Sequence, residues 1–250
     1  MKVFSSYSIK GGVGKTALSV NLAYALQQEE HRTLLVDLDP QGASAFYFRV
    51  GPAEKFKAKK ERWLMGDRLR RNIRESDFPG LDILPSNLAY RNFDLMLDRM
   101  EKSKKQLRRI LRTLQNDYDY IVLDCPPGLT LLSENVFRAS DLIIVPVIPT
   151  MLSKRTFVQL HEFLRQRDYP ESRIVPFFSM VQKRNRIHRD TMEAMTEGHP
   201  EFLKTVIPFT VEIEKMGLYR RPVLTYARPQ SAAHAYRELC AEIIHLEKNI

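Results

Sequence analysis

The sequence lacks long apolar runs and has few of the residues that build disulfide or metal frameworks. Its 250 residues include only one tryptophan and two cysteines, Cys125 and Cys240. Two cysteines are too few for a scaffold that depends on several disulfides. The six histidines show no metal-binding spacing, so we expect a metal to enter only with a bound ligand. No apolar segment approaches the roughly 20 residues that cross a bilayer. Residues 1–12 resemble a first strand more than a signal peptide, which predicts a cytoplasmic protein.

Acidic residues are outnumbered by basic ones. The 39 Lys and Arg and 30 Asp and Glu give a net charge of +9, and the pI is near 9.5. A content of 44% hydrophobic and 28% charged residues is that of an ordinary soluble protein. A basic surface attracts nucleic acid, anionic lipid or an acidic partner. Charge alone fits a merely soluble basic protein equally well.

Short β-rich runs alternate with longer helical runs along the chain. This alternation predicts a single α/β domain over residues 1–250, with a doubly wound, mostly parallel sheet flanked by helices. Several strands are almost continuously hydrophobic, as expected where helices cover both faces of a sheet. The predicted strands are 3–8, 32–37, 81–84, 120–124, 142–147 and 174–178, with 205–207 as an additional candidate. The predicted helices are 15–27, 101–116, 153–167, 189–197 and 231–247.

Residues 50–78 form the least regular part of the sequence. Nine Lys or Arg fall between Lys55 and Arg74, and Trp63 lies among them. From short helices, Leu64, Leu69 and Ile73 are expected to face the body of the protein. We interpret the charge run itself as a solvated surface.

A glycine-rich turn follows the first strand and opens the first helix. Residues 10–16 read KGGVGKT, and such glycines let backbone N–H groups approach a phosphate beside the positive end of the helix dipole. Lys15 is expected to reach the β- and γ-phosphates, and the Thr16 hydroxyl to bind Mg²⁺. Ile9 replaces the first glycine of the usual motif, and an extra Lys10 precedes the glycines. The predicted ATP-binding residues here are Lys10, Gly11, Gly12, Val13, Gly14, Lys15, Thr16 and Ala17.

Three ordered blocks resemble the ParA/MinD-type ATPases, the deviant Walker A branch of the P-loop proteins. The first block is 10–16. The second is 36–42 (VDLDPQG), similar to the switch segment of ParA proteins, and the third is 118–127 (YDYIVLDCPP), similar to their Walker B strand. The resemblance extends over nearly the whole chain. It implies a P-loop fold of the SIMIBI class, ATP and Mg²⁺ as cofactors, and slow ATP hydrolysis stimulated by a partner protein.

The resemblance also implies roles for individual residues. Lys10 resembles the signature lysine, which reaches the partner's nucleotide in an ATP-bound dimer and acts much as an arginine finger does. Asp39 matches the switch residue that orients the attacking water and supports Mg²⁺, so Lys10 and Asp39 are the expected catalytic pair. Asp37 and Asp124 match carboxylates of the metal's outer shell. The alternative for Asp37 and Asp39 is a turn or a helix N-cap.

Further along the chain the resemblance is looser. Met180 and Pro208 match positions beside the nucleotide and are expected to contact ATP. Two arginine positions of the family are occupied here by Phe209 and Glu212. Because one of those arginines contributes to DNA binding in family members, that assignment does not carry over. The chain starts close to its first strand, so we expect no N-terminal extension that reads specific DNA.

Basic clusters elsewhere are candidates for a DNA surface. Neutralising several phosphates gives sequence-blind binding that weakens steeply with salt, and a solvated surface is the competing interpretation for each cluster. Six bases lie on residues 102–112. The candidate DNA-binding residues are Lys183, Arg184, Arg186, Arg189, Arg220, Arg221 and Arg237.

The function implied by the resemblance is a nucleoid-associated positioning ATPase. An ATP-bound homodimer would bind DNA nonspecifically, and a cargo-bound adaptor protein would stimulate hydrolysis and release. The cargo stays open between DNA and a protein assembly such as a carboxysome or chemoreceptor cluster, and the departures at Phe209 and Glu212 favour protein. A MinD-like membrane role is disfavoured because the helix at 231–247 has several glutamates and few bases. The alternative from another class is a metabolic ATP-dependent ligase or synthetase.

Overall fold

One seven-stranded sheet organises the computed structural model, which describes residues 1–51, 67–86, 97–100, 103–228 and 232–248. Its strand order is β3-β4-β2-β5-β1-β6-β7, and every pairing is parallel except that of β3 with β4. The sheet therefore confirms a doubly wound α/β fold. The strands are β1 (Lys2–Ser6), β2 (Thr33–Asp37), β3 (Arg74–Glu75), β4 (Leu81–Leu84), β5 (Tyr120–Asp124), β6 (Leu142–Val147) and β7 (Ile174–Phe178).

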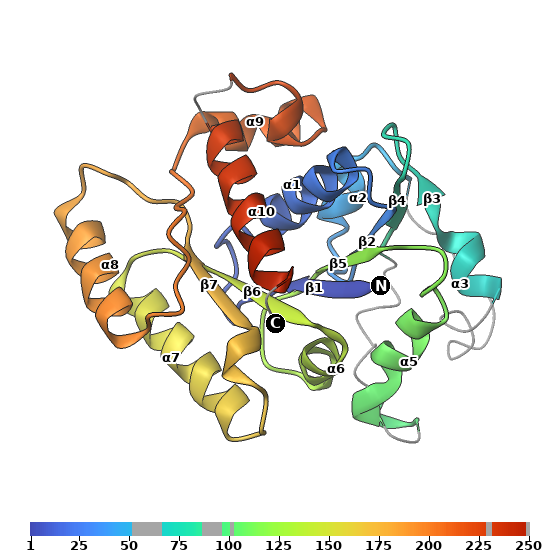
Figure 1. Ribbon diagram of the computed structural model, residues 1–250, viewed down its shortest axis with the longest axis horizontal. Helices are drawn as coiled ribbons and strands as arrows, with labels where there is room; N and C mark the ends of the chain where they lie inside the picture. Colours follow the sequence, from blue (N-terminus) through green and yellow to red (C-terminus); the bar gives the residue numbers. More distant parts are fainter. Residues whose placement is uncertain (52–66, 87–96, 101–102, 229–231, 249–250) are drawn as a thin grey trace.

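Helices cover both faces of this sheet (Figure 1). One face carries α5 (Gln106–Arg112), α6 (Leu131–Ala139) and α7 (Met151–Arg165), and α8 (Arg186–Gly198) lies outside α7. The other face carries α1 (Lys15–Gln28), α2 (Ala43–Tyr47), α9 (Val211–Tyr219) and α10 (Ala232–Lys248). The short helix α3 (Asp67–Asn72) lies by the β3 edge, and single 3-10 turns occur at Ser103–Lys105, Glu171–Arg173 and Val223–Thr225.

Successive side chains of a strand point to opposite faces of the sheet, so the apolar side chains pack into two separate cores. In β5, Ile121 and Leu123 pack into the core on the α5–α6–α7 face, whereas Tyr120 and Val122 pack into the core on the α1–α10 face. Apart from the short edge strand β3, whose two residues are charged and not buried, the strands are thus largely buried on both sides, which explains their nearly continuous apolar sequences. Burying one such side chain contributes about 1.5–3 kcal/mol.

The predicted elements agree with the structure within a few residues, apart from one strand. The helix predicted at 101–116 is shorter, because α5 covers only Gln106–Arg112. The strand candidate at 205–207 is wrong: Ile207 donates its N–H to the Phe178 carbonyl and accepts from the Val181 N–H, but the described residues form only an isolated bridge here, between the following Pro208 and Val181. Leu69 is buried and Ile73 packs against the core, as expected. Trp63 and Leu64 lie outside the described residues.

Three of the described helices, α2, α6 and α9, were missed because their signals are short. In α6, Thr130 and Ser133 form a capping box that fixes the start of a nine-residue helix. In α9, the Thr210 side chain accepts a hydrogen bond from the Glu212 backbone N–H. All three helices span few turns, so their apolar periodicity is weak in the sequence.

The central position of β5 leads to a stability prediction. Leu123→Ala removes a fully buried side chain from the middle strand of the sheet, and we expect it to lower the free energy of unfolding by roughly 2–5 kcal/mol. Urea denaturation followed by circular dichroism measures this. Leu218→Ala is the matched control, since Leu218 is 74% exposed. Equal losses in both variants would contradict the assignment of the core.

Candidate functional site

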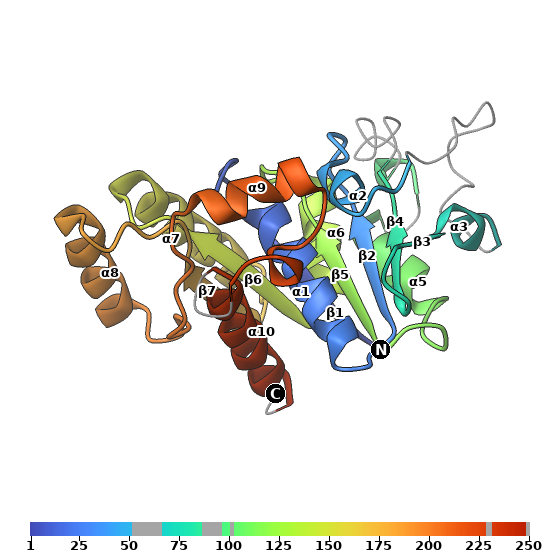
Figure 2. The same cartoon turned by 90° about the horizontal axis from the view of Figure 1, so that it is seen from above.

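The carboxyl ends of three neighbouring strands meet at one edge of the sheet. In the parallel register, Asp124 of β5 is the Cα partner of Ser6 in β1 and of Asp37 in β2. The arrowheads in Figure 2 point to this edge, which α2 and α9 flank. Ligands of open α/β sheets bind outside the carboxyl ends of the strands. The side chains collected here therefore form the candidate site.

The turn between β1 and α1 has the backbone of an anion cradle. Gly12 and Gly14 adopt positive φ values of 70° and 96°, which side-chain-bearing residues rarely adopt. A Cβ on Gly14 would lie 3.0 Å from the Ser179 Oγ, whereas a Cβ on Gly11 or Gly12 would meet no atom of the described residues within 4 Å. The open space before the first turn of α1 fits a phosphate group.

The Lys15 side chain is held inside this turn. It is buried, and its Nζ donates a hydrogen bond to the Lys10 carbonyl oxygen at 3.1 Å. Burial lowers the pKa of Lys15, and the nearby charges of Asp124, Cys125 and Asp39 act in the opposite direction. A phosphate in the cradle would supply the opposite charge that this ammonium lacks.

Asp124 is fully buried and surrounded by hydroxyl donors. The Ser19 Oγ donates to its Oδ1 at 3.1 Å, and the Ser44 Oγ donates to its Oδ2. Burial raises the pKa of Asp124, and hydrogen bonds from Ser44, Thr16 and Ser19 partly offset that rise. The carboxylate thus links α1 to α2 below the cradle, within reach of the Thr16 hydroxyl.

Asp37 is buried beside Asp124. Its Oδ1 accepts from the Asp39 N–H at 3.2 Å, and its Oδ2 accepts from the Ala45 N–H at 3.3 Å. Burial, followed by the charge of Asp124, raises the pKa of Asp37 well above its usual range. Two adjacent buried carboxyl groups fit an electropositive ligand such as a hydrated Mg²⁺ ion.

Asp39 is more open than these two carboxylates. Its Oδ1 accepts from the Gln41 N–H at 2.9 Å, which makes a local turn. Together with the bond from Ala45 in the first turn of α2 to Asp37, this gives the turn and capping geometry weighed as the alternative. Capping and metal support are compatible, because each carboxyl group accepts several hydrogen bonds.

The segment expected beside the base lies against the cradle. Met180 has a positive φ of 54°, and its Cε lies 3.8 Å from the Cβ position of Gly14. Val181 donates its N–H to the Ile207 carbonyl at 2.9 Å and bridges to Pro208. The structure therefore brings Met180, Pro208 and the glycine loop to one edge from distant parts of the sequence.

Lys10 is half-buried and lines a narrow crevice between its own loop, β6 and α7, with Val145 and Phe157 among the other lining residues.

The two serines that hydrogen-bond to Asp124 were not identified from the sequence. Ser19 stands one helical turn after Lys15 and could have been found from that spacing. Ser44 has no such signal, because only the tertiary fold brings it to Asp124.

The candidate DNA-binding residues do not form one cluster. Lys183, Arg184, Arg186 and Arg189 are exposed around the start of α8. Arg220 follows α9, where its Nε donates to the Phe46 carbonyl at 3.1 Å and its guanidinium lies over the Phe46 ring. Arg221 lies near the rings of Tyr219 and Tyr226, and Arg237 is exposed on α10.

The chain is similar in sequence to known proteins over most of its length. PomZ, a cell division protein of Myxococcus xanthus, is 30% identical over 229 residues, which cover 90% of this chain and 72% of PomZ. Soj, a sporulation initiation inhibitor protein of Bacillus subtilis, is 27% identical over 247 residues, which cover 97% of this chain and 98% of Soj. Both relatives match well beyond the glycine-rich turn.

A solved structure and a family model extend the comparison. A Mycobacterium smegmatis protein, described as cobyrinic acid a,c-diamide synthase with bound ATP analogue and magnesium, superposes with a TM-score of 0.80 at 26% identity, covering 99% of this chain and 96% of that one. Residues 1–170 match the family model described as an AAA domain. With its glycine cradle, its buried strand-end carboxylates and these relatives, the chain belongs to the ParA/MinD-type P-loop ATPases.

Proposed function

We propose that this protein is a positioning ATPase whose ATP-bound form is a homodimer that holds DNA and is released through an adaptor protein on the cargo. ATP and Mg²⁺ are its cofactors, as in the family. The observation that carries the proposal is the placement of Lys10 beside a phosphate cradle that adjoins Asp37, Asp39 and Asp124. Such an edge supplies positioning and charge neutralisation, which phosphoryl transfer chiefly requires.

Each residue of the edge has a distinct part in this proposal. The backbone N–H groups of residues 11–14 and the Lys15 ammonium bind the phosphates, and the Thr16 hydroxyl holds Mg²⁺. Asp37 and Asp124 hold the water shell of the metal, and Asp39 orients the attacking water. Met180 and Pro208 contact the base. Lys10 acts across the dimer interface, where its charge stabilises the transferring phosphoryl group of the partner's nucleotide.

Apolar exposure at this edge supports a protein partner there. Large apolar side chains are exposed on the segments that begin α7, α8 and α9, and an enclosed substrate pocket would bury such groups. A homodimer interface is enriched in them. The residues concerned are Met151, Leu152, Ile187, Phe209 and Val211.

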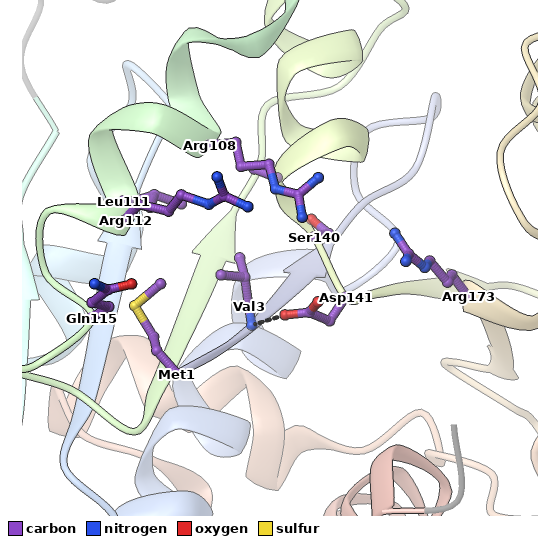
Figure 3. A pocket seen from close by; sticks show the side chains of 10 residues that line it. Met1, Val3, Arg108, Leu111, Arg112, Gln115, Ser140, Asp141 and Arg173 are labelled. Atoms are coloured by element: carbon purple, nitrogen blue, oxygen red, sulfur yellow. Dashed lines mark hydrogen bonds between the residues drawn. The ribbon is translucent and has the colours of Figure 1, made fainter.

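Two basic surfaces compete for the DNA. The first is the exposed cluster of Lys183, Arg184 and neighbouring bases at the start of α8. The second lies at the amino edge of the sheet, where Arg108, Arg112 and Arg173 line a cavity (Figure 3). Among the described residues that line this cavity, the one carboxylate is that of Asp141, which accepts from the Val3 N–H at 2.8 Å. We propose that the α8 cluster binds the DNA. It adjoins the Met180 segment, so its position can depend on whether a nucleotide is bound.

The last helix supports attachment to the body of the protein instead of to a membrane. Glu242 accepts from the N–H groups of Lys204 and Thr205, at 2.8 and 3.0 Å, and Glu247 pairs with Lys2 at 2.7 Å. None of the described helices is long and apolar enough to cross a bilayer. We therefore propose that the protein is nucleoid-associated and that its cargo is either DNA or a protein assembly. The departures at Phe209 and Glu212 favour a protein cargo.

The two lysines of the loop are expected to separate binding from hydrolysis. Lys15→Gln removes the ammonium from the cradle and should abolish ATP binding, measured by fluorescence of a labelled nucleotide. Lys10→Ala should retain binding but lose most hydrolysis, by a factor on the order of 10³ if it acts as arginine fingers do. Normal hydrolysis by Lys10→Ala would show that the signature-lysine role is wrong.

Asp39→Ala is expected to trap the dimer. Without Asp39 the attacking water is not oriented, so ATP should persist and hold two chains together. Size-exclusion chromatography with light scattering, with ATP and Mg²⁺, should give twice the monomer mass of 29.2 kDa. The matched control is Asp77→Ala, which removes an exposed carboxylate far from the site. A monomer in the presence of bound ATP would instead favour the ligase or synthetase alternative.

DNA binding should depend on the α8 cluster and on salt. Arg184→Glu combined with Arg189→Glu should weaken binding of the ATP-bound Asp39→Ala dimer and reduce the salt slope by about 0.9 for each phosphate that is no longer neutralised. Arg108→Glu combined with Arg112→Glu is the charge-matched control on the opposite edge. Fluorescence anisotropy with unrelated duplexes measures both. If only the control pair loses affinity, the amino edge is the DNA surface, and absence of binding at low salt excludes DNA altogether.

A further inference from the structure

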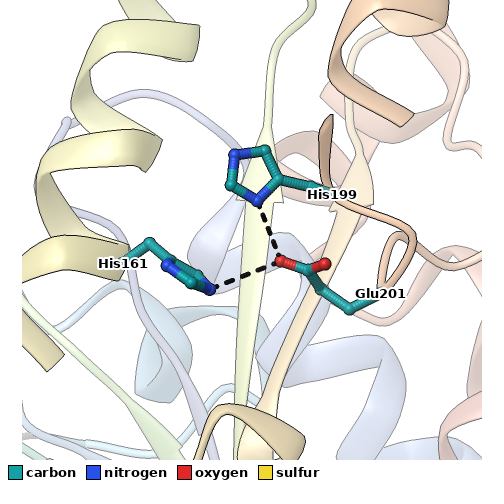
Figure 4. Close-up of side chains that lie close together, drawn as sticks. All are labelled: His161, His199 and Glu201. Atoms are coloured by element: carbon teal, nitrogen blue, oxygen red, sulfur yellow. Dashed lines mark hydrogen bonds and ion pairs between the residues drawn. The ribbon is translucent and has the colours of Figure 1, made fainter. Parts of the chain in front are cut away.

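Two histidines and a glutamate, none of them among the residues of the nucleotide edge, lie close together (Figure 4). His161 comes from α7, His199 ends α8, and Glu201 lies in the turn that follows. The Glu201 Oε1 lies 3.1 Å from the His199 Nδ1 and 3.5 Å from the His161 Nε2. One ligand atom from each of the three residues lies within 4.8 Å of the other two.

These separations match the ligand spacing of a tetrahedral ion. With bond lengths of 2.0–2.2 Å to nitrogen and carboxylate oxygen, neighbouring ligands of zinc lie about 3.3–3.5 Å apart. The two measured nitrogen–oxygen distances, 3.1 and 3.5 Å, differ little from that value. The ligand nitrogens of the two imidazoles lie within 4.8 Å of each other, so rotating the rings to bring these nitrogens to the same spacing would place all three ligand atoms on one ion.

Aromatic packing holds the two imidazoles in place. The Phe157 ring contacts the His199 ring edge-on, with centroids 5.0 Å apart, and also packs on Phe202. Phe202 in turn stacks on Phe178 at the end of β7. The imidazole of His161 lies 5.2 Å from that of His199, centroid to centroid. Ligands fixed by packing against the core lose little conformational entropy on binding.

The surroundings favour a cation although the whole protein is basic. The trio lines an open cavity of about 460 Å³, which Glu162, Glu171 and Arg165 also line. Counting Glu201, three carboxylates face one guanidinium, whereas the chain as a whole has a net charge of +9. A local excess of negative charge in a positive protein raises the local concentration of cations.

We propose that His161, His199 and Glu201 bind one divalent transition-metal ion, of which zinc fits best. Two imidazole nitrogens and one carboxylate oxygen suit zinc, whereas Mg²⁺ prefers oxygen ligands alone. The open cavity leaves the fourth position to water. The ion ties α7 to the end of α8 and to the following turn, which links segments that are distant in the sequence. This site is separate from the ATP site and does not depend on the proposed function.

Zinc titration of the tag-free protein tests the site. Isothermal titration calorimetry is performed with ADP and excess Mg²⁺ present, so that the cradle is filled. The cysteines do not interfere, because Cys125 and Cys240 are both buried. We expect one zinc ion per chain, and roughly tenfold or greater loss of affinity in His161→Ala and in His199→Ala. The matched control is His234→Ala, which removes an exposed histidine beside Glu238 and should leave binding unchanged.

Thermal denaturation gives an independent readout. Zinc should raise the Tm of the wild type and of His234→Ala, because it binds only the folded chain. The Tm of His161→Ala should not respond to zinc, whatever its starting stability. Equal zinc uptake by wild type and His161→Ala, or no uptake by the wild type, would overturn the proposal. A Co²⁺-loaded sample lacking the absorption of tetrahedral coordination would overturn the assigned geometry.

Discussion

Two carboxylates buried side by side at the ends of β2 and β5 determine much of the architecture around them. Burying charges costs several kcal/mol each unless they are paired or hydrogen-bonded. Asp124 meets this requirement with the hydroxyls of Ser19 and Ser44, and Asp37 meets it with the backbone of Asp39 and Ala45. These bonds fix the amino-terminal halves of α1 and α2 relative to the sheet. The carboxylates thereby position the phosphate cradle as well as lining it.

The buried Lys15 belongs to the same electrostatic balance. Removal from water lowers the pKa of this ammonium and raises the pKa values of the two carboxyl groups, while the charge of Asp124 favours the charged form of Lys15. The positive and negative groups of this edge therefore compensate one another only in part. A phosphate beside Lys15 and a cation beside the carboxylates would complete the compensation together. This explains physically why a metal–nucleotide complex fits the edge better than either component alone.

The charges of the molecule are segregated among distinct surfaces. The cavity at the amino edge has three lining arginines and one carboxylate, whereas the cavity around His161 has three carboxylates and one arginine. A single net charge conceals this difference. The first surface attracts anions and the second attracts cations, although both lie outside the nucleotide edge. Partner preference in this protein is therefore a local property of each surface.

The sequence alone determined the fold class, most strands and the phosphate loop. Continuous apolar runs indicate strands that are buried on both faces of a sheet. The glycines around Lys15 indicate a backbone conformation that few other residues adopt. Both signals are local, so they can be recognised without any knowledge of the tertiary contacts. The candidate strand at 205–207 was wrong because a short apolar run does not show whether its pairing is regular: Ile207 hydrogen-bonds to Phe178 at the end of β7 and to Val181, but the ladder amounts to one isolated bridge.

Only the tertiary structure decided which distant side chains meet. Ser44 reaches Asp124 because the register of β2 against β5 places the start of α2 over the strand end. His161 reaches His199 because α7 packs beside α8, although no metal-binding spacing joins them in the sequence. The tertiary structure also showed that the basic residues at α8 and those after α9 lie on separate surfaces, which the sequence could not show. Local patterns determine elements and loops, whereas contacts between elements depend on packing that no single segment encodes.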